Sequence, residues 1–129
     1  MKVVSRDNSE HYLWGEQDLG GDQGAGGKAC DGWHLVKRPA LSVIQERVPV
    51  GMGEQRHYHK VAEQFFFILS GTALLEVEGI EHRLTAHQGM HVAPGQAHCL
   101  RNGGEQVLEF LVTSTPPSHG DRVKTKVKV

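Results

Sequence analysis

His57 and His59 are separated by one residue, a spacing that allows two imidazoles to bind one metal ion. On a β-strand, residues i and i+2 point to the same face, so these side chains would project together and Tyr58 would point away. Two imidazoles on one face are typical ligands of a divalent transition metal. A further imidazole, His98, follows the turn at 94–95 and would begin a new strand. These are three of the nine histidines in a chain of 129 residues.

The segments around these histidines have the pattern of short β-strands. They alternate in polarity or are rich in apolar residues, and Gly- or Pro-bearing turns separate many of them: 41–48, 64–69, 72–77, 81–85, 91–93, 97–101 and 106–113. Many short strands at regular spacing predict a β-sandwich or barrel. The segment that suits a short helix is 7–12, because Asp7, Asn8 and Ser9 can cap one.

Two segments resemble the two motifs of the cupin superfamily. The first motif is Gly, five residues, His-x-His, three or four residues, Glu, six residues, Gly, which resembles 51–71 (GMGEQRHYHKVAEQFFFILSG). The second is Gly, five residues, Pro-x-Gly, two residues, His, three residues, Asn, which resembles 87–102 (HQGMHVAPGQAHCLRN). The resemblance implies an all-β double-stranded β-helix, a jelly-roll barrel with six to eight main strands. It also implies a metal site formed by His57, His59, Gln64 and His98.

This sequence departs from the family pattern at three positions. Gln64 stands where the family usually has its ligand Glu, although some cupins use Gln there, including a family that acts on unsaturated uronate sugars. Glu63 is the alternative ligand, because it satisfies the shorter spacing from His59. We favour Gln64, because the turn at Gly71 fixes the register and a one-residue slip reverses the side-chain face. His87 and Ala93 replace the opening Gly and the first Pro of the second motif, which are not ligand positions.

The implied ligand set predicts the chemistry of the site. Three neutral imidazoles and an amide leave the charge of the ion uncompensated, which favours Lewis-acid catalysis on an anionic small molecule. The metal is one of Fe, Ni, Zn, Cu or Mn, whose preferences these ligands fit. The resemblance implies either isomerase or lyase chemistry on a sugar acid or dioxygen-dependent cleavage. The alternatives are a non-catalytic small-molecule-binding or sensor cupin, and a barrel that has lost its metal.

Further residues are predicted to lie at the substrate pocket. Phe66 shares the strand face of Gln64, and Gln45 and Arg47 share a polar face that would bind a carboxylate if it pointed into the barrel. His91 is a candidate to support the metal ligands, while His82 and His87 are weaker ones. The candidate acid or base groups are Tyr58, Glu63, His91 and Glu109.

Composition sets limits on the partners. The formal net charge is -1 and the hydrophobic fraction is 38%, so neither nucleic acid nor a membrane is expected as a partner. The first fifteen residues have no apolar export signal, which predicts a cytoplasmic protein with Cys30 and Cys99 as free thiols. A short barrel has edge strands to protect, which favours a homodimer.

The chain is predicted to form one domain over residues 1–129. Its parts are an N-terminal region (1–40), a barrel (41–115) and a tail (116–129). The N-terminal region contains the Gly-rich segment 15–32, which is predicted to be either a surface insertion or a lid over the pocket.

Overall fold

A computed structural model describes residues 2–17, 29–118 and 120–125. In this part of the chain, one short 3-10 helix, η1 (Arg6–Asn8), precedes a series of β-strands. The strands are β1 (Glu10–Trp14), β2 (Glu16–Gln17), β3 (Cys30–Arg38), β4 (Leu41–Val48), β5 (Met52–Gly53), β6 (His57–His59), β7 (Glu63–Ser70), β8 (Ala73–Val77), β9 (Ile80–Leu84), β10 (Gly89–Val92), β11 (His98–Asn102), β12 (Leu108–Thr115) and β13 (Arg122–Lys124).

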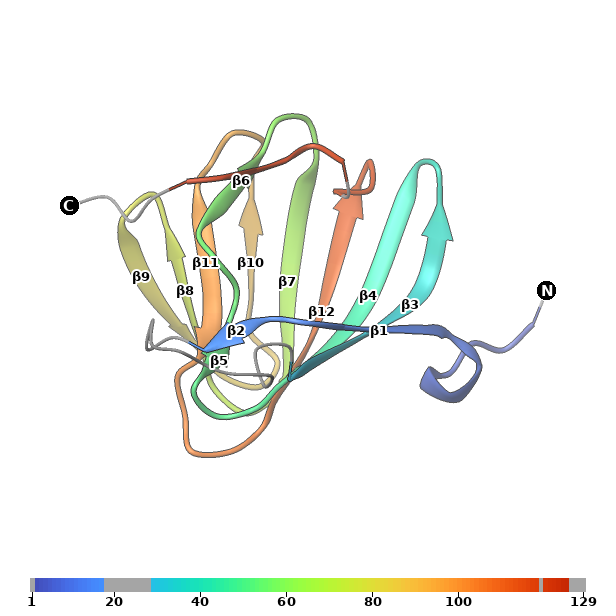
Figure 1. The fold of residues 1–129 in the computed structure, drawn as a ribbon, viewed down its shortest axis with the longest axis horizontal. Coiled ribbons are helices and arrows are strands. Elements are labelled where there is room, and N and C mark those ends of the chain that lie inside the picture. Colours follow the sequence, from blue (N-terminus) through green and yellow to red (C-terminus); the bar gives the residue numbers. More distant parts are fainter. Residues whose placement is uncertain (1, 18–28, 119, 126–129) are drawn as a thin grey trace.

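The strands form two antiparallel sheets that face each other. The first has the order β1-β3-β4-β12-β7-β10, and the second has the order β13-β6-β11-β5-β2, with β8 paired to β11 and β9 paired to β8. In Figure 1 the first sheet fans out to the right, while β8, β9 and β11 lie to the left. Neighbours such as β7 and β12 are distant in sequence, as expected for a jelly roll.

Strand alternation gives the interior an apolar part and a polar end. Val112 on β12 pairs with Ile44 on β4 and with Phe66 on β7, so three buried apolar side chains form one row across the sheet. Two residues further along β12, Ser114 pairs with Gln64, and both are buried. The register that fills the core therefore also places polar side chains inside the barrel.

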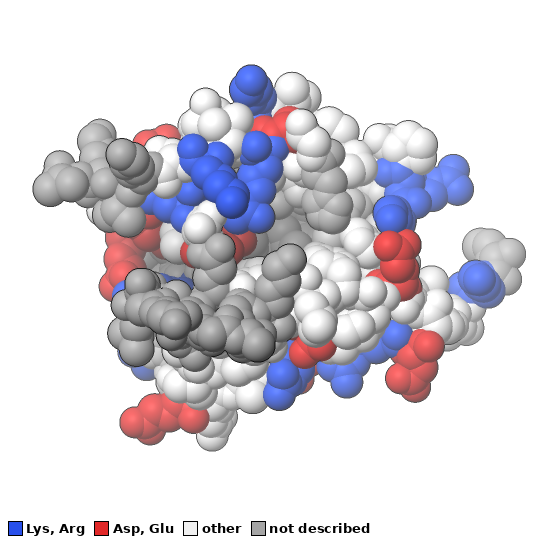
Figure 2. Space-filling view, in the orientation of Figure 1, with Lys and Arg blue, Asp and Glu red and all other residues white. Residues whose placement is uncertain are grey.

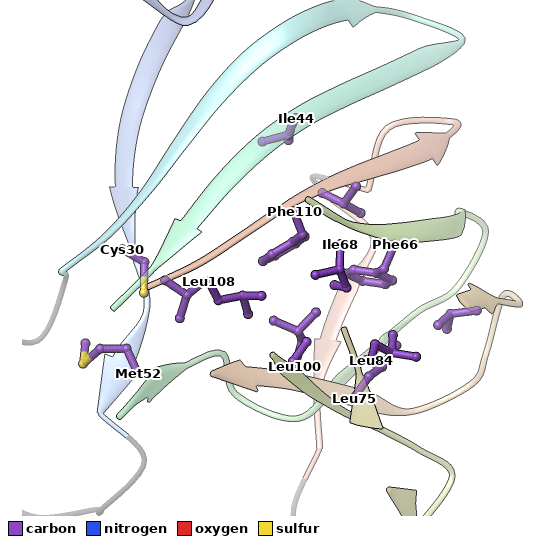
Figure 3. Packing of buried hydrophobic residues seen from close by; sticks show 14 of the residues in the cluster. Cys30, Ile44, Met52, Phe66, Ile68, Leu75, Leu84, Leu100, Leu108 and Phe110 are labelled. Atoms are coloured by element: carbon purple, nitrogen blue, oxygen red, sulfur yellow. The ribbon is translucent and has the colours of Figure 1, made fainter. Parts of the chain in front are cut away.

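The hydrophobic core lies between the two sheets. Figure 3 shows Phe66, Ile68 and Phe110 from the first sheet pointing toward Leu75 and Leu100 from the second. Each of these five side chains is at most 3% exposed, so burial of their apolar area is a major stabilising contribution. Phe66 contacts both the core and the site, because its ring lies 6.0 Å from Phe110 and 5.8 Å from His98.

The predicted all-β barrel is confirmed, and the seven predicted strands match β4 and β7–β12 within three residues at each end. The helical piece predicted at 7–12 is present in part as η1, which ends at Asn8, and Glu10–Trp14 pairs with β3 as a strand instead. The strand count is also larger than predicted, because strands from the N-terminal region and the tail join both sheets. Residues 18–28 lie outside the described residues, and they are most of the Gly-rich segment that is predicted to be a surface insertion or a lid.

Among the described residues, no helix is both long and apolar enough to cross a membrane.

Candidate metal centre

Three imidazoles meet inside the barrel where β6 and β11 pair. His57 lies opposite His98 in the register of these strands, and His59 follows on the same face of β6. Their ligand atoms all lie within 4.8 Å of one another, and each residue is at most 5% exposed. The sequence prediction that His57 and His59 project together agrees with this placement, as does the half-buried position of Tyr58 on the other face.

The Nδ1 atom of each imidazole faces a hydrogen-bond acceptor. His57 Nδ1 lies 2.7 Å from the carbonyl oxygen of Gln55, and His98 Nδ1 lies 3.0 Å from that of Gln96. His59 Nδ1 lies 2.9 Å from Oδ1 of Asp121. Each Nδ1 therefore carries the proton and donates it, which leaves the Nε2 lone pair of each ring for a metal ion.

Gln64 brings its amide oxygen to this cluster. Its Nε2 donates to Ser114 Oγ at 3.0 Å, and its Oε1 lies 3.1 Å from His98 Nε2. A neutral imidazole has one N–H group, and His98 has an acceptor at both nitrogens. With the proton on Nδ1, the lone pair of His98 Nε2 lies 3.1 Å from Gln64 Oε1, a separation that suits two neighbouring ligands of one metal ion. This arrangement fits a metal ion bound by both atoms.

Glu63, the alternative ligand, points away from the cluster. Its side chain is 54% exposed and pairs with His91 at 2.8 Å, on the outer face of the sheet. Because adjacent residues of β7 alternate between faces, Gln64 is inside and Glu63 is outside.

Burial favours the neutral form of His57 and His98. Removal from water, followed by the positive charge of Arg122, lowers the pKa of His57 to about 3. Burial also lowers the pKa of His98, although Glu54 acts in the opposite direction. Neutral imidazoles are the form that binds a metal ion, so little energy is spent on removing protons near neutral pH.

The cluster opens into a cavity of about 360 Å³ between the two sheets. Phe66, Trp14 and Ile44 form apolar parts of its wall, and Tyr12, Glu46 and Glu54 add polar groups. Tyr12 reaches this position because β3 has a glycine beside it. A Cβ atom on Gly32 would lie 2.4 Å from Cζ of Tyr12, so only glycine leaves room for the phenol ring.

Two carboxyl groups face the cavity from opposite sides. The pKa of Glu46 is raised well above its ordinary value, mainly by removal from water and then by the nearby charge of Glu54. The pKa of Glu54 is also raised by burial, against the opposing influence of His98 and Arg122. Burial and these two acids raise the pKa of Tyr12 as well. The cavity therefore holds acidic groups that burial makes easier to keep protonated.

The C-terminal segment closes one side of the cavity. Ser118, Gly120 and Arg122 line it, and Arg122 is the only Lys or Arg among its described lining residues. Figure 2 shows Lys and Arg side chains gathered on the face where the C-terminal segment passes in front of the barrel in Figure 1. The neighbouring Asp121 stays ionised, because the N–H groups of Ala62 and Val61 and the imidazole of His59 lower its pKa against the effect of burial.

Three of the predicted pocket residues lie elsewhere. The prediction for Gln45 and Arg47 is wrong, because they are on the outer face of β4. There Gln45 donates to Glu109 at 3.1 Å, and Arg47 lies 3.4 Å from Asp31. The inward face of β4 carries Ile44, Glu46 and Val48 instead, because Ile44 and Val48 pack in the core. His91 is 55% exposed and does not approach the cluster, whereas Phe66 does line the cavity.

The other candidate acid and base groups do not line the cavity either. Tyr58 is on the opposite face of β6, and Glu109 pairs with Arg6 at 3.1 Å on the outer face. His82 and His87 are likewise absent from the described histidine cluster. Cys30 is a buried free thiol whose pKa is raised to about 12 by burial, which makes it unreactive. Cys99 is also free, and its thiol donates to the carbonyl oxygen of Glu54 at 2.9 Å.

Sequence reasoning missed Tyr12, Glu46, Glu54, Asp121 and Arg122. One signal was available for Glu46, because it shares a strand face with Ile44 and Val48, and an acid among apolar residues is unusual in a core. Asp121 and Arg122 had no comparable signal. Their positions depend on the pairing of β13 with β6, two segments more than 60 residues apart.

The fold and the site define a double-stranded β-helix barrel with an internal histidine cluster suited to a metal ion. The model of the Cupin domain family matches residues 44–114, which is more than half of the chain. The protein therefore belongs to the cupin superfamily.

Individual relatives agree with this assignment. The chain is 30% identical over 89 residues to an uncharacterized protein of Methanocaldococcus jannaschii, covering 68% of this chain and 71% of that protein. It is 34% identical over 61 residues to mannose-1-phosphate guanylyltransferase of Salmonella montevideo, covering 47% of this chain but only 12% of that enzyme. A solved structure of a predicted oxalate decarboxylase from Thermotoga maritima superimposes with a TM-score of 0.75 at 20% identity. That match covers 90% of this chain and all of the other. At this identity, the structural similarity shows a shared fold.

Proposed function

We propose that this cupin is a metal-dependent enzyme that transfers a proton on a small anionic molecule. The observation that carries the proposal is the cluster of His57, His59 and His98 beside the amide of Gln64, which opens into a cavity containing Glu46. One relative, a mannose-1-phosphate guanylyltransferase, is named for a phosphorylated sugar, which belongs to the proposed substrate class.

The residues that would hold the ion are His57, His59 and His98 through Nε2 and Gln64 through Oε1. These donors suit Fe, Ni, Zn, Cu or Mn. When bound, a divalent ion polarises a carbonyl or carboxylate oxygen of the substrate and stabilises the negative charge that develops there.

The remaining cavity residues supply binding and proton transfer. Arg122 would bind the anionic group of the substrate, and Trp14 and Phe66 would exclude water from the reacting atoms. Glu46 would donate or accept the proton, because it lines the cavity and burial raises its pKa well above that of an exposed carboxyl group. This acid inside the cavity favours isomerase or lyase chemistry over dioxygen-dependent cleavage, which does not need it.

The first experiment measures metal content in protein purified without a His tag or added metal. We expect about one divalent ion per chain in the wild type and a loss of most of it in His57→Ala. His91→Ala is the matched control, because His91 is exposed on the outer face and should leave the metal content unchanged. A wild-type protein that is empty and also fails to bind added metal would contradict the proposal and favour a non-catalytic binding protein.

We also infer that the protein forms a homodimer through the outer face of the first sheet, which carries the exposed ring of Phe65 and the half-buried ring of Phe67.

A further inference from the structure

We infer that Asp121 is a positioning residue that fixes the proton of His59 on Nδ1 and thereby joins the C-terminal segment to the metal cluster. This inference rests on the metal site of the proposed function and adds a residue outside both sequence motifs.

The Asp121 carboxylate makes three contacts with the chain that carries His59. Its Oδ1 lies 2.9 Å from His59 Nδ1, and its Oδ2 accepts hydrogen bonds from the backbone N–H groups of Val61 and Ala62, each at 2.9 Å. Its own carbonyl oxygen also accepts from the N–H group of Lys60 at 3.3 Å. Both oxygens are therefore used, and one of them is directed at the imidazole.

The three histidines differ in which residue accepts the hydrogen bond from Nδ1. His57 and His98 each donate Nδ1–H to the carbonyl oxygen two residues earlier in the chain, so their orientation is fixed locally. His59 depends on a residue 62 positions away. A carboxylate is also a stronger acceptor than a carbonyl group, and it makes the imidazole a more basic metal ligand.

The segment that contains Asp121 also forms part of the cavity wall. The next residue, Arg122, pairs with His59 in the ladder between β13 and β6 and lines the cavity. Beyond it, the N–H group of Thr125 donates to the carbonyl oxygen of Arg56 at 3.0 Å. The segment that completes the wall of the cavity therefore also orients one of the three imidazoles.

The proposal is tested first without metal, by nitrogen-15 NMR of histidine-labelled protein at pH 7.5. In the wild type, all three imidazoles should carry the proton on Nδ1. In Asp121→Ala, His59 should change to the Nε2–H form that free imidazole prefers, while His57 and His98 should keep theirs. Lys124→Ala is the matched control, because Lys124 is exposed on the same strand and should change none of the three.

The second measurement is Zn²⁺ affinity by competition with a chelator. Removal of a carboxylate that supports a metal ligand should weaken binding about 10- to 100-fold in Asp121→Ala, with no change in Lys124→Ala. Asp121→Asn gives the same test with less disturbance, because asparagine has the same shape as aspartate. Its one amide oxygen cannot accept hydrogen bonds from both His59 and the two backbone N–H groups.

Two results would overturn the inference. One is a His59 ring that keeps its proton on Nδ1 in both Asp121 variants. The other is a joint change at His57, His59 and His98, which would indicate a general loss of structure. If the wild type binds no Zn²⁺ at all, the proposed function fails, and the tautomer of His59 still decides the role of Asp121.

Discussion

Glu46 is an acid in an apolar row. On the inner face of β4 it lies between Ile44 and Val48, and it pairs in register with Phe110 of the core. Burial of a carboxyl group among such neighbours is unfavourable, and the cost falls when the group keeps its proton. An acid at this position is therefore easier to explain by chemistry than by stability.

The role of Glu46 can be tested in Glu46→Gln. We expect metal content to stay the same and proton transfer to fall at least about 100-fold, because the amide cannot exchange a proton as a general acid or base. The measurement is incorporation of deuterium from ²H₂O into a panel of keto acids and sugar acids, followed by proton NMR. Glu109→Gln, on the outer face, is the control. Equal exchange rates in wild type and Glu46→Gln would exclude Glu46 as the proton-transfer group.

His57 should make the stability of the metal-free protein depend on pH. Its pKa is about 3 in the folded chain, against an ordinary value of 6.5. Between these pH values the unfolded chain binds the extra proton, so the free energy of unfolding falls as the pH drops below 6.5. The fall amounts to about 1.4 kcal/mol per pH unit for this side chain.

Urea unfolding of metal-free wild type and His57→Gln at pH 7, 6 and 5 isolates this effect. Any stability advantage of the wild type over the variant should shrink as the pH falls, because glutamine does not titrate. A constant difference across this range would mean that His57 binds its proton as readily in the folded chain as in the unfolded chain.

At the scale of elements, the motif strands were predictable and the remaining parts of the site were not. The candidate ligands His57 and His59 on β6 could be predicted because alternation acts within a few residues, and the resemblance to the cupin motifs implied Gln64 on β7 and His98 on β11. On β4, each face mixes apolar and polar residues. One face carries Val43 and Arg47, and the other carries Ile44 and Glu46. The face that points inside is determined by the pairing of Ile44 with Val112 and of Val48 with Leu108. This pairing with β12 cannot be predicted from the sequence of β4 alone.

The short strand β13 illustrates the same limit. Three residues that alternate in polarity predict an edge strand, but they do not indicate which strand it joins. Its pairing with β6 brings Arg122 beside His59 and into the wall of the cavity. A cavity residue on such a strand can be identified only once the fold is known.

Arg122 should therefore control anion binding separately from metal binding. In the metal-loaded protein, Arg122→Gln should weaken the binding of a small dicarboxylate such as oxalate by about tenfold or more, because a charge-assisted contact is lost. Isothermal titration calorimetry measures the change, with metal content determined in parallel. Lys124→Gln, two residues along the same strand, should bind oxalate as the wild type does. Equal weakening in both variants would indicate a nonspecific effect of net charge.

For the whole molecule, the outer face of the first sheet has an open apolar region. The N-terminal segment covers one part of this face, where Arg6 lies 4.5 Å above the ring of Trp33 and pairs with Glu109. On β7, Phe65 is 44% exposed and stacks with Phe67 at 6.2 Å. A second copy of the chain would cover these rings in a twofold arrangement, in which the same patch contacts itself.

We expect this outer face of the first sheet to form the dimer interface. The wild type should have twice the chain mass of 14.2 kDa in solution, and Phe65→Asp should be a monomer, because a dimer would bury the new charge against an apolar surface. Ile80→Asp is the matched control, since Ile80 is 64% exposed on β9 in the other sheet and should leave the dimer intact. Light scattering coupled to size-exclusion chromatography measures the masses. A wild-type monomer would show that Phe65 lies on a free surface, and a dimer that persists in Phe65→Asp but is lost in Ile80→Asp would place the interface on the second sheet.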